Sequence, residues 1–256
     1  MKKIFLLLAL CSATVFAQKK TYSHSLQGIK KVQIQSASTV NLISGNTNQL
    51  EISGVKNEND DKRLQEKKKG LKAVYSIGVD NTNGFGFTIT KEGNLLIIKD
   101  LKSHFQRGRI TITLPKTMNV DINSGSLGSI KVDGFTSEIE VRTTTGSINL
   151  KNVTGPITAH TSTGVINVTF TTVSQSSPIS ITSSTGEIDV ALPRNTKANL
   201  NVSSRGTIYT NFDFKAPDKK GLPNISGLKK ISSPLNGGGV TIKLKSSMGR
   251  IYLRKK

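Results

Sequence analysis

The chain has 256 residues but only one cysteine, Cys11, and no tryptophan. Because Cys11 falls within an expected export signal, we expect the mature chain to contain no cysteine at all. A chain without cysteine cannot form disulfides, thiolate zinc sites or cysteine nucleophiles. An exported protein of this kind must be stabilised by its own hydrophobic core, and the chain is long enough to build one.

The first residues predict a signal peptide over residues 1–17. Two lysines precede an apolar run at residues 4–10, and residues 15–17, with the sequence VFA, form a cleavage signal. The apolar run is too short to anchor the chain in a bilayer. A lipoprotein signal would use Cys11, but Leu10 occupies the position where that signal requires a small residue. We therefore expect an exported protein, in the periplasm, on the outer surface or secreted.

Acidic residues are scarce, with 16 Asp and Glu against 36 Lys and Arg, for a formal net charge of +20. A charge this large bears on partners and solubility, not on fold. It suggests an anionic envelope or extracellular partner, such as lipopolysaccharide or an acidic glycan. A basic surface that keeps the protein soluble explains it equally well. No aromatic stacking platform accompanies the lysines, which argues against nucleic acid.

Six Gly-x-Ile triplets form a repeat in the second half of the chain, and apolar residues alternate with polar residues on both sides of each. Such alternation predicts strands with one buried face. We assign the glycine to a corner between two strands that requires a positive φ, which glycine adopts at low cost. Successive glycines are 18, 18, 22, 20 and 43 residues apart, and the last interval is close to two repeats. The repeat glycines are Gly128, Gly146, Gly164, Gly186, Gly206 and Gly249.

A strand pair of this length cannot bury its apolar face alone, whereas stacked copies bury a continuous column of Ile and Val. The sequence therefore predicts an all-β protein with a β-solenoid, single-stranded and β-helix-like, of about six coils. An antiparallel β-sandwich is the alternative. We expect an N-terminal β-rich part of the solenoid at 18–118 and the Gly-x-Ile repeats at 119–256. The charged segment 56–71 is predicted to be an exposed helical turn.

Three stretches of the chain, TTTGSINL, TSTGVINV and SSTGEIDV, are followed later by LNGGGVTIKLKSSMGRIYLRK. This series resembles a bacterial family of β-repeat proteins known as putative adhesins. The resemblance extends over about residues 28–254, nearly the whole mature chain. It implies an exported, solenoid-like all-β domain whose molecular function is largely unestablished.

The residues three positions after each repeat glycine form one outward row if the coils stack in register. Asn149 and Asn167 would then lie about 4.8 Å apart, a spacing that allows their amides to stack. Basic residues in the loops are the other candidates for binding. The candidate binding residues are Lys131, Asn149, Asn167, Asp189 and Tyr209 in the row, and Arg107, Arg109, Lys219 and Lys220 in or near loops.

Catalytic constellations are hard to find in this sequence. Glu187 and Asp189 share one face, so a polysaccharide-processing β-solenoid enzyme is the alternative function, since such catalysis needs two carboxylates. No candidate base repeats with the many serines and threonines, and no histidine pair has metal-ligand spacing. We therefore predict a non-enzymatic binding scaffold or adhesin of the cell envelope, without metal or cofactor. An envelope-stress or regulatory accessory is a third hypothesis.

Overall fold

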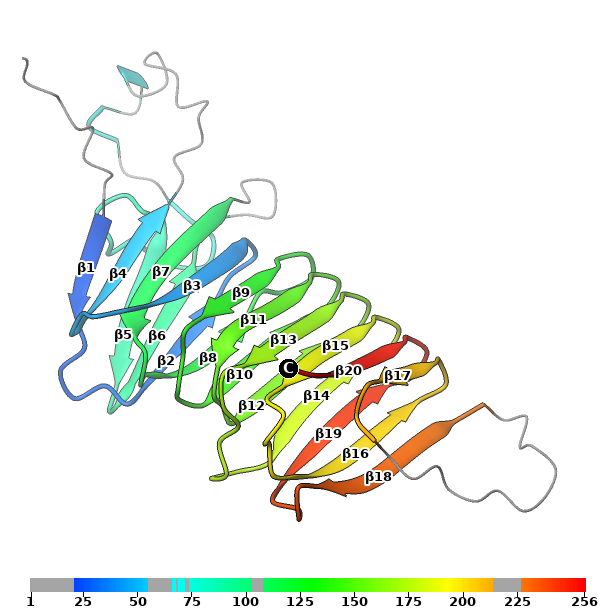
Figure 1. Ribbon diagram of the computed structural model, residues 1–256. Helices are drawn as coiled ribbons and strands as arrows, with labels where there is room; N and C mark the ends of the chain where they lie inside the picture. Colours follow the sequence, from blue (N-terminus) through cyan, green and yellow to red (C-terminus); the bar gives the residue numbers. More distant parts are fainter. Residues whose placement is uncertain (1–20, 55–65, 68, 72–73, 103–107, 214–226) are drawn as a thin grey trace, which may run out of the picture.

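The computed structural model describes residues 21–54, 66–67, 69–71, 74–102, 108–213 and 227–256. The expected signal peptide and most of the charged segment 56–71 lie outside these residues. The strands form two ten-stranded sheets, sheet A and sheet B, which stack against each other along an elongated body (Figure 1).

The two sheets have the following strands in spatial order. Sheet A contains β1 (Thr21–Ser25), β4 (Gln49–Gly54), β7 (Arg109–Pro115), β3 (Thr39–Gly45), β9 (Ile130–Asp133), β11 (Ile148–Val153), β13 (Ile166–Phe170), β15 (Ile188–Leu192), β20 (Ile251–Lys255) and β17 (Ile208–Thr210). Sheet B, taken from its opposite end, contains β18 (Lys229–Leu235), β16 (Ala198–Ser204), β19 (Val240–Ser246), β14 (Ile179–Ser183), β12 (Ile157–Thr161), β10 (Ile139–Thr143), β8 (Asn119–Asn123), β2 (Lys31–Gln35), β6 (Leu95–Asp100) and β5 (Phe87–Glu92).

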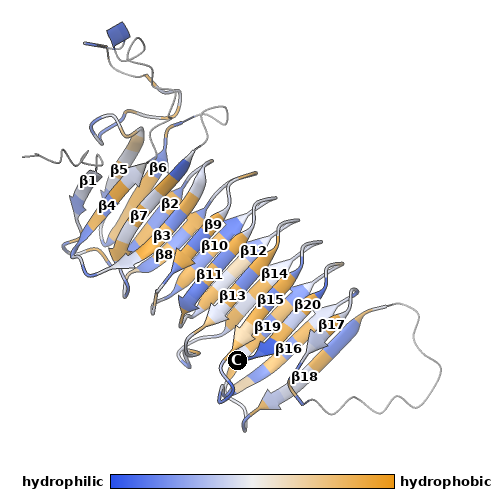
Figure 2. Ribbon diagram, turned by 45° about the horizontal axis from the view of Figure 1, so that its top comes forward, coloured by the Kyte–Doolittle hydropathy of each residue, from blue (hydrophilic) through white to orange (hydrophobic). Residues whose placement is uncertain are grey.

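The chain alternates between the sheets, so a strand of sheet B and the next strand of sheet A make one coil. Parallel pairing in register aligns Ile148, Ile166 and Ile188 in sheet A, and all three are fully buried. Each such side chain contributes about 1.5–3 kcal/mol by its burial. Apolar and polar residues alternate along the strands of both sheets (Figure 2). The all-β solenoid is therefore confirmed, and the central strands are parallel, unlike those of an antiparallel sandwich.

The repeat glycines form a column at one corner, but not for the reason that we predicted. None of the six has a positive φ. A Cβ added to Gly164 would overlap the backbone carbonyl of Gly146, and one added to Gly146 would overlap that of Gly128. Glycine is required because successive coils approach each other closely at this corner. The prediction of a positive φ at the repeat glycines is wrong.

A buried hydroxyl group links each of several repeat glycines to the neighbouring coil. Thr161 Oγ1 accepts a hydrogen bond from the Gly164 N–H and donates one to the Gly146 carbonyl oxygen, both at 3.2 Å. Ser246 makes the equivalent two bonds at the sixth copy, both at 2.9 Å. At these copies the hydroxyl residue before the glycine thus satisfies backbone groups that the tight corner would otherwise bury without partners.

Replacing Thr161 with valine is expected to lower the free energy of unfolding by about 1–3 kcal/mol. Valine keeps nearly the same shape but has no hydroxyl, so the Gly164 N–H and the Gly146 carbonyl oxygen lose this partner. Urea denaturation followed by circular dichroism measures the loss. The control is Thr163→Val at an exposed position of the same turn, which is expected to change stability by less than about 0.5 kcal/mol. Equal losses in both variants would contradict the role of the buried hydroxyl.

A coil is inserted out of sequence order near each end of the solenoid. The sixth Gly-x-Ile copy leads into β20, and the coil of β19 and β20 lies between the coils β14–β15 and β16–β17. In the same way, β2 and β3 lie between β6–β7 and β8–β9. The long interval between the last two glycines therefore contains β18, through which the chain returns from the terminal coil.

Antiparallel strands lie at the ends of the parallel stacks. At the C-terminal end β18 pairs with β16, and at the N-terminal end β5 pairs with β6 and β4 with β7. These strands cover the edges of coils that would otherwise offer unpaired backbone groups. Among the described residues, no helix is long and apolar enough to cross a membrane.

Candidate functional site

The predicted outward row exists on the outer face of sheet A. Parallel register places Lys131, Asn149, Asn167 and Asp189 side by side on β9, β11, β13 and β15. The next residue in the row is Tyr252 and not Tyr209, because β20 is inserted between β15 and β17. The predicted row is therefore present as a set of neighbouring residues. At its end Tyr252 comes before Tyr209, which is the reverse of their order in the sequence.

The two asparagines of the row are linked directly. Asn167 Nδ2 donates a hydrogen bond of 2.8 Å to Asn149 Oδ1 across adjacent strands. Asn149 Nδ2 in turn lies 3.4 Å from Ser147 Oγ. The expected interaction between stacked amides is therefore present. Because these groups satisfy one another, this part of the row is a polar surface and not a set of unpaired ligand-binding groups.

Glu187 and the row residue Asp189 are held by two arginines, Arg250 immediately before β20 and Arg254 on it. Arg250 Nη1 lies 3.0 Å from Glu187 Oε1, and Arg254 makes a bidentate contact with Asp189 at 2.8 Å to each carboxylate oxygen. The hydrogen bond to the partner carboxylate raises the pKa of each guanidinium. The carboxylates are therefore ion-paired on an open surface.

Two tyrosines continue the row to the end of sheet A. The rings of Tyr209 and Tyr252 stack with their centroids 5.2 Å apart and their planes 10° apart. Tyr209 lies on the edge strand β17 and is 49% exposed. The Arg254 guanidinium lies 5.5 Å from the centre of the Tyr252 ring. We call the outward group at this end the tyrosine–arginine platform, which comprises Glu187, Asp189, Tyr209, Arg250, Tyr252 and Arg254.

The other candidate residues do not join this platform. Arg109 is exposed at the start of β7, near the opposite end of sheet A. The candidates Arg107, Lys219 and Lys220 lie outside the described residues. Within the described part of the chain, no cluster of His, Cys, Asp and Glu could hold a metal ion.

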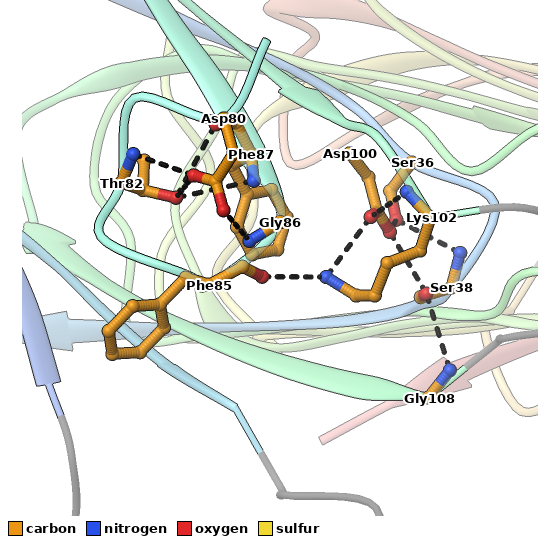
Figure 3. A network of polar contacts seen from close by, with 10 residues as sticks. All are labelled: Ser36, Ser38, Asp80, Thr82, Phe85, Gly86, Phe87, Asp100, Lys102 and Gly108. Atoms are coloured by element: carbon orange, nitrogen blue, oxygen red, sulfur yellow. Dashed lines mark hydrogen bonds and ion pairs between the residues drawn. The ribbon is translucent and has the colours of Figure 1, made fainter. Parts of the chain in front are cut away.

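The N-terminal end contains a separate buried polar cluster (Figure 3). Asp100 has a fully buried side chain and accepts hydrogen bonds from Ser36 Oγ at 2.8 Å and Ser38 Oγ at 3.0 Å. Lys102 Nζ lies 3.1 Å from the other carboxylate oxygen of Asp100. A buried carboxylate is tolerated only with such partners. The cluster joins β6 to the β2–β3 corner, so we assign it a structural role.

Asp80 lies close to this cluster and organises the loop before β5. It accepts hydrogen bonds from the Thr82 N–H at 2.7 Å, the Thr82 hydroxyl at 2.6 Å and the Gly86 N–H at 2.9 Å. Burial raises the pKa of Asp80, but these hydrogen bonds to the charged form outweigh it and leave the pKa below its ordinary value. All these contacts are within one loop, which points to loop structure.

Comparison with known proteins gives a family and two similar structures. The model of the Toastrack DUF4097 family matches residues 88–234, more than half of the chain. The crystal structure of a "putative cell adhesion protein" from Clostridium sporogenes is 14% identical with a TM-score of 0.46, covering 93% of this chain and 99% of that one. That of a "putative adhesin" from Bacteroides fragilis is 16% identical with a TM-score of 0.39, covering 93% and 96%. No curated protein matches the chain.

Proposed function

Because the chain belongs to the Toastrack DUF4097 family, whose fold it shares, we propose that it is a non-enzymatic scaffold exported to the cell envelope, where it binds a saccharide on sheet A. Family membership confirms the resemblance to a β-repeat family. Export is supported by the predicted signal peptide. The saccharide is supported by one observation above all, the tyrosine–arginine platform.

The platform combines the two kinds of contact that a sugar offers. The stacked pair of Tyr209 and Tyr252 presents an exposed aromatic surface at the end of sheet A, against which the apolar C–H face of a sugar ring can pack. Asp189 and Arg254 present charged hydrogen-bonding groups fixed by their bidentate contact. Groups held in one geometry bind hydroxyl groups with little further loss of conformational entropy. We therefore place the saccharide across β15, β20 and β17.

The same geometry favours binding over glycan cleavage. Hydrolysis by two carboxylates needs one of them protonated as a general acid, and both need access to the scissile bond. Here Glu187 and Asp189 are each engaged in an ion pair with an arginine, which restricts their access to a scissile bond. Glu187 immediately precedes β15 and Asp189 lies on it, two residues further along the same outer surface, so neither is opposite the other across a bound chain. These features support a binding module.

Replacing Tyr209 with alanine is expected to weaken saccharide binding by about tenfold or more, which corresponds to about 1.4 kcal/mol. The substitution removes the exposed ring of the pair while leaving the buried core intact. A glycan array of neutral and acidic envelope oligosaccharides first identifies the bound sugar. Isothermal titration with that sugar then compares the variant with the wild-type protein.

The matched control is Leu127→Ala, because Leu127 is 51% exposed, close to the 49% of Tyr209, and lies outside the platform. It is expected to bind like the wild-type protein. If the protein retained no sugar on the array, or if Tyr209→Ala bound as tightly as Leu127→Ala, the platform would not be the binding site. If the retained glycan were shortened during incubation, the protein would be an enzyme and the proposal would be wrong.

A further inference from the structure

A second outward row lies on sheet B, on the opposite side of the core from the tyrosine–arginine platform. Register aligns Lys230, Ser203, Lys245, Thr182 and His160 on the neighbouring strands β18, β16, β19, β14 and β12. The row crosses the strands and so follows the long axis of the solenoid. Its two lysines are separated by one strand, which places their backbones roughly 9.6 Å apart.

These five strands expose positive charge without negative charge. Lys243 lies on β19 two residues before Lys245, and Asn201 is its neighbour on β16. The outward positions otherwise carry only Ser, Thr, Asn, one His and one Pro. None of the ion pairs in the described part of the chain includes Lys230, Lys243 or Lys245. We call this surface, with its three lysines, the lysine face.

The next part of sheet B is different, and this difference sets the boundary of the lysine face. On β10, Arg142 lies 3.3 Å from Asp121 and 3.8 Å from Glu140. Glu140 is also 2.8 Å from Lys31. There the basic groups are neutralised by carboxylates of the same surface. From β12 to β18 no such carboxylate is present on the outward face, so the lysines are left for an external anion.

We propose that the lysine face binds a linear acidic polysaccharide that lies along the solenoid axis. An extended chain with evenly spaced carboxylates can follow a straight row whose two lysines, Lys230 on β18 and Lys245 on β19, are separated by one strand. The hydroxyl and amide groups between the lysines, such as Ser203 and Asn201, can hydrogen-bond the hydroxyl groups of the sugar. This site is independent of the saccharide proposed for sheet A, which requires no charge on its ligand.

Two other polyanions fit this surface less well. Binding of single-stranded nucleic acid uses aromatic side chains on which bases stack, and the outward positions of these strands have no Phe, Tyr or Trp. Association with a bilayer usually adds apolar side chains that enter the headgroup region, and no large apolar side chain points outward here. A hydroxyl-rich, flat and basic surface is best matched by a polymer that is itself rich in hydroxyl groups.

The test measures binding of the full chain to polygalacturonate, with uncharged dextran as the control polymer, in roughly 50 and 300 mM salt. The variant Lys230→Ala/Lys243→Ala/Lys245→Ala is expected to bind polygalacturonate at least about tenfold more weakly at low salt. The matched control, Lys116→Ala/Lys151→Ala/Lys256→Ala, loses the same charge elsewhere and is expected to lose less than about threefold. Thermal unfolding of both variants verifies that they are folded.

Each outcome decides the proposal. Equal loss in the two triple variants would show that only net charge matters, and would overturn it. Stronger binding to phosphatidylglycerol vesicles or to oligothymidylate than to polygalacturonate would also overturn it, in favour of a membrane or nucleic-acid surface. Tyr209→Ala is expected to bind polygalacturonate like the wild-type protein, so failure on sheet A and failure on sheet B are distinguishable.

Discussion

Replacing Gly164 with alanine is expected to destabilise the protein by about 3 kcal/mol or more. The added Cβ would overlap the carbonyl group of Gly146, which is backbone and cannot rotate away. The coils would have to move apart at this corner, which would stretch the hydrogen bond between Thr161 and Gly146 and the neighbouring ladder. Thermal or urea denaturation measures the loss, with a lower midpoint as the readout.

Substitutions at two other glycines distinguish the two reasons why alanine could destabilise the protein, close approach of the backbone and a backbone conformation that only glycine adopts easily. Gly108 has open space around the position of a Cβ and no positive φ, so Gly108→Ala is expected to be nearly neutral. Gly93 also has open space but a φ of +60°, so Gly93→Ala is expected to cost about 1–2 kcal/mol from backbone strain alone. If Gly164→Ala were no more damaging than Gly108→Ala, close approach between coils would not explain the repeat glycines.

The sequence was sufficient to predict the features that recur within each coil. The alternation around the Gly-x-Ile phrase determined which residues point inward, because the period of a strand is two. It therefore identified the buried column through Ile148, Ile166 and Ile188, and the amide pair of Asn149 and Asn167 on the outside. Both follow from local periodicity combined with in-register stacking of equal repeats.

The prediction of a positive φ at the repeat glycines was wrong because a sequence does not distinguish between two reasons for a residue without a Cβ. A positive φ and a close backbone contact both select glycine, and only coordinates reveal the neighbouring carbonyl. One signal was available in retrospect. The hydroxyl residue a few positions before most of the repeat glycines suggested a tight, buried corner that needs side-chain hydrogen bonds.

The order of the coils could not be read from the sequence either. Strand pairing between β15 and β20 joins residues about sixty positions apart, and no local pattern encodes it. The tyrosine–arginine platform and the lysine face both depend on this insertion. Arg254 reaches Asp189 only because β20 lies beside β15. Lys245 joins the row of His160 and Lys230 only because β19 separates β14 from β16.

Replacing Ile188 with aspartate is expected to prevent folding. Ile188 has no exposed surface and lies in the middle of the buried column between Ile166 and Ile251. The variant loses about 1.5–3 kcal/mol of apolar burial. It must also bury a carboxylate without a partner, which costs several kcal/mol more. Together these losses approach or exceed the stability of about 5–15 kcal/mol that is usual for a folded domain.

The matched control is Asn167→Asp, because it introduces the same side chain one position along the neighbouring strand, on the exposed face. That variant loses the hydrogen bond to Asn149 and is expected to change stability by less than about 1 kcal/mol. Far-ultraviolet circular dichroism and size-exclusion chromatography distinguish the two results. A folded Ile188→Asp protein beside an unfolded Asn167→Asp protein would mean that the inward and outward faces are exchanged. Both binding surfaces proposed for the outside would then be part of the core, so this pair of variants tests the basis of every other assignment.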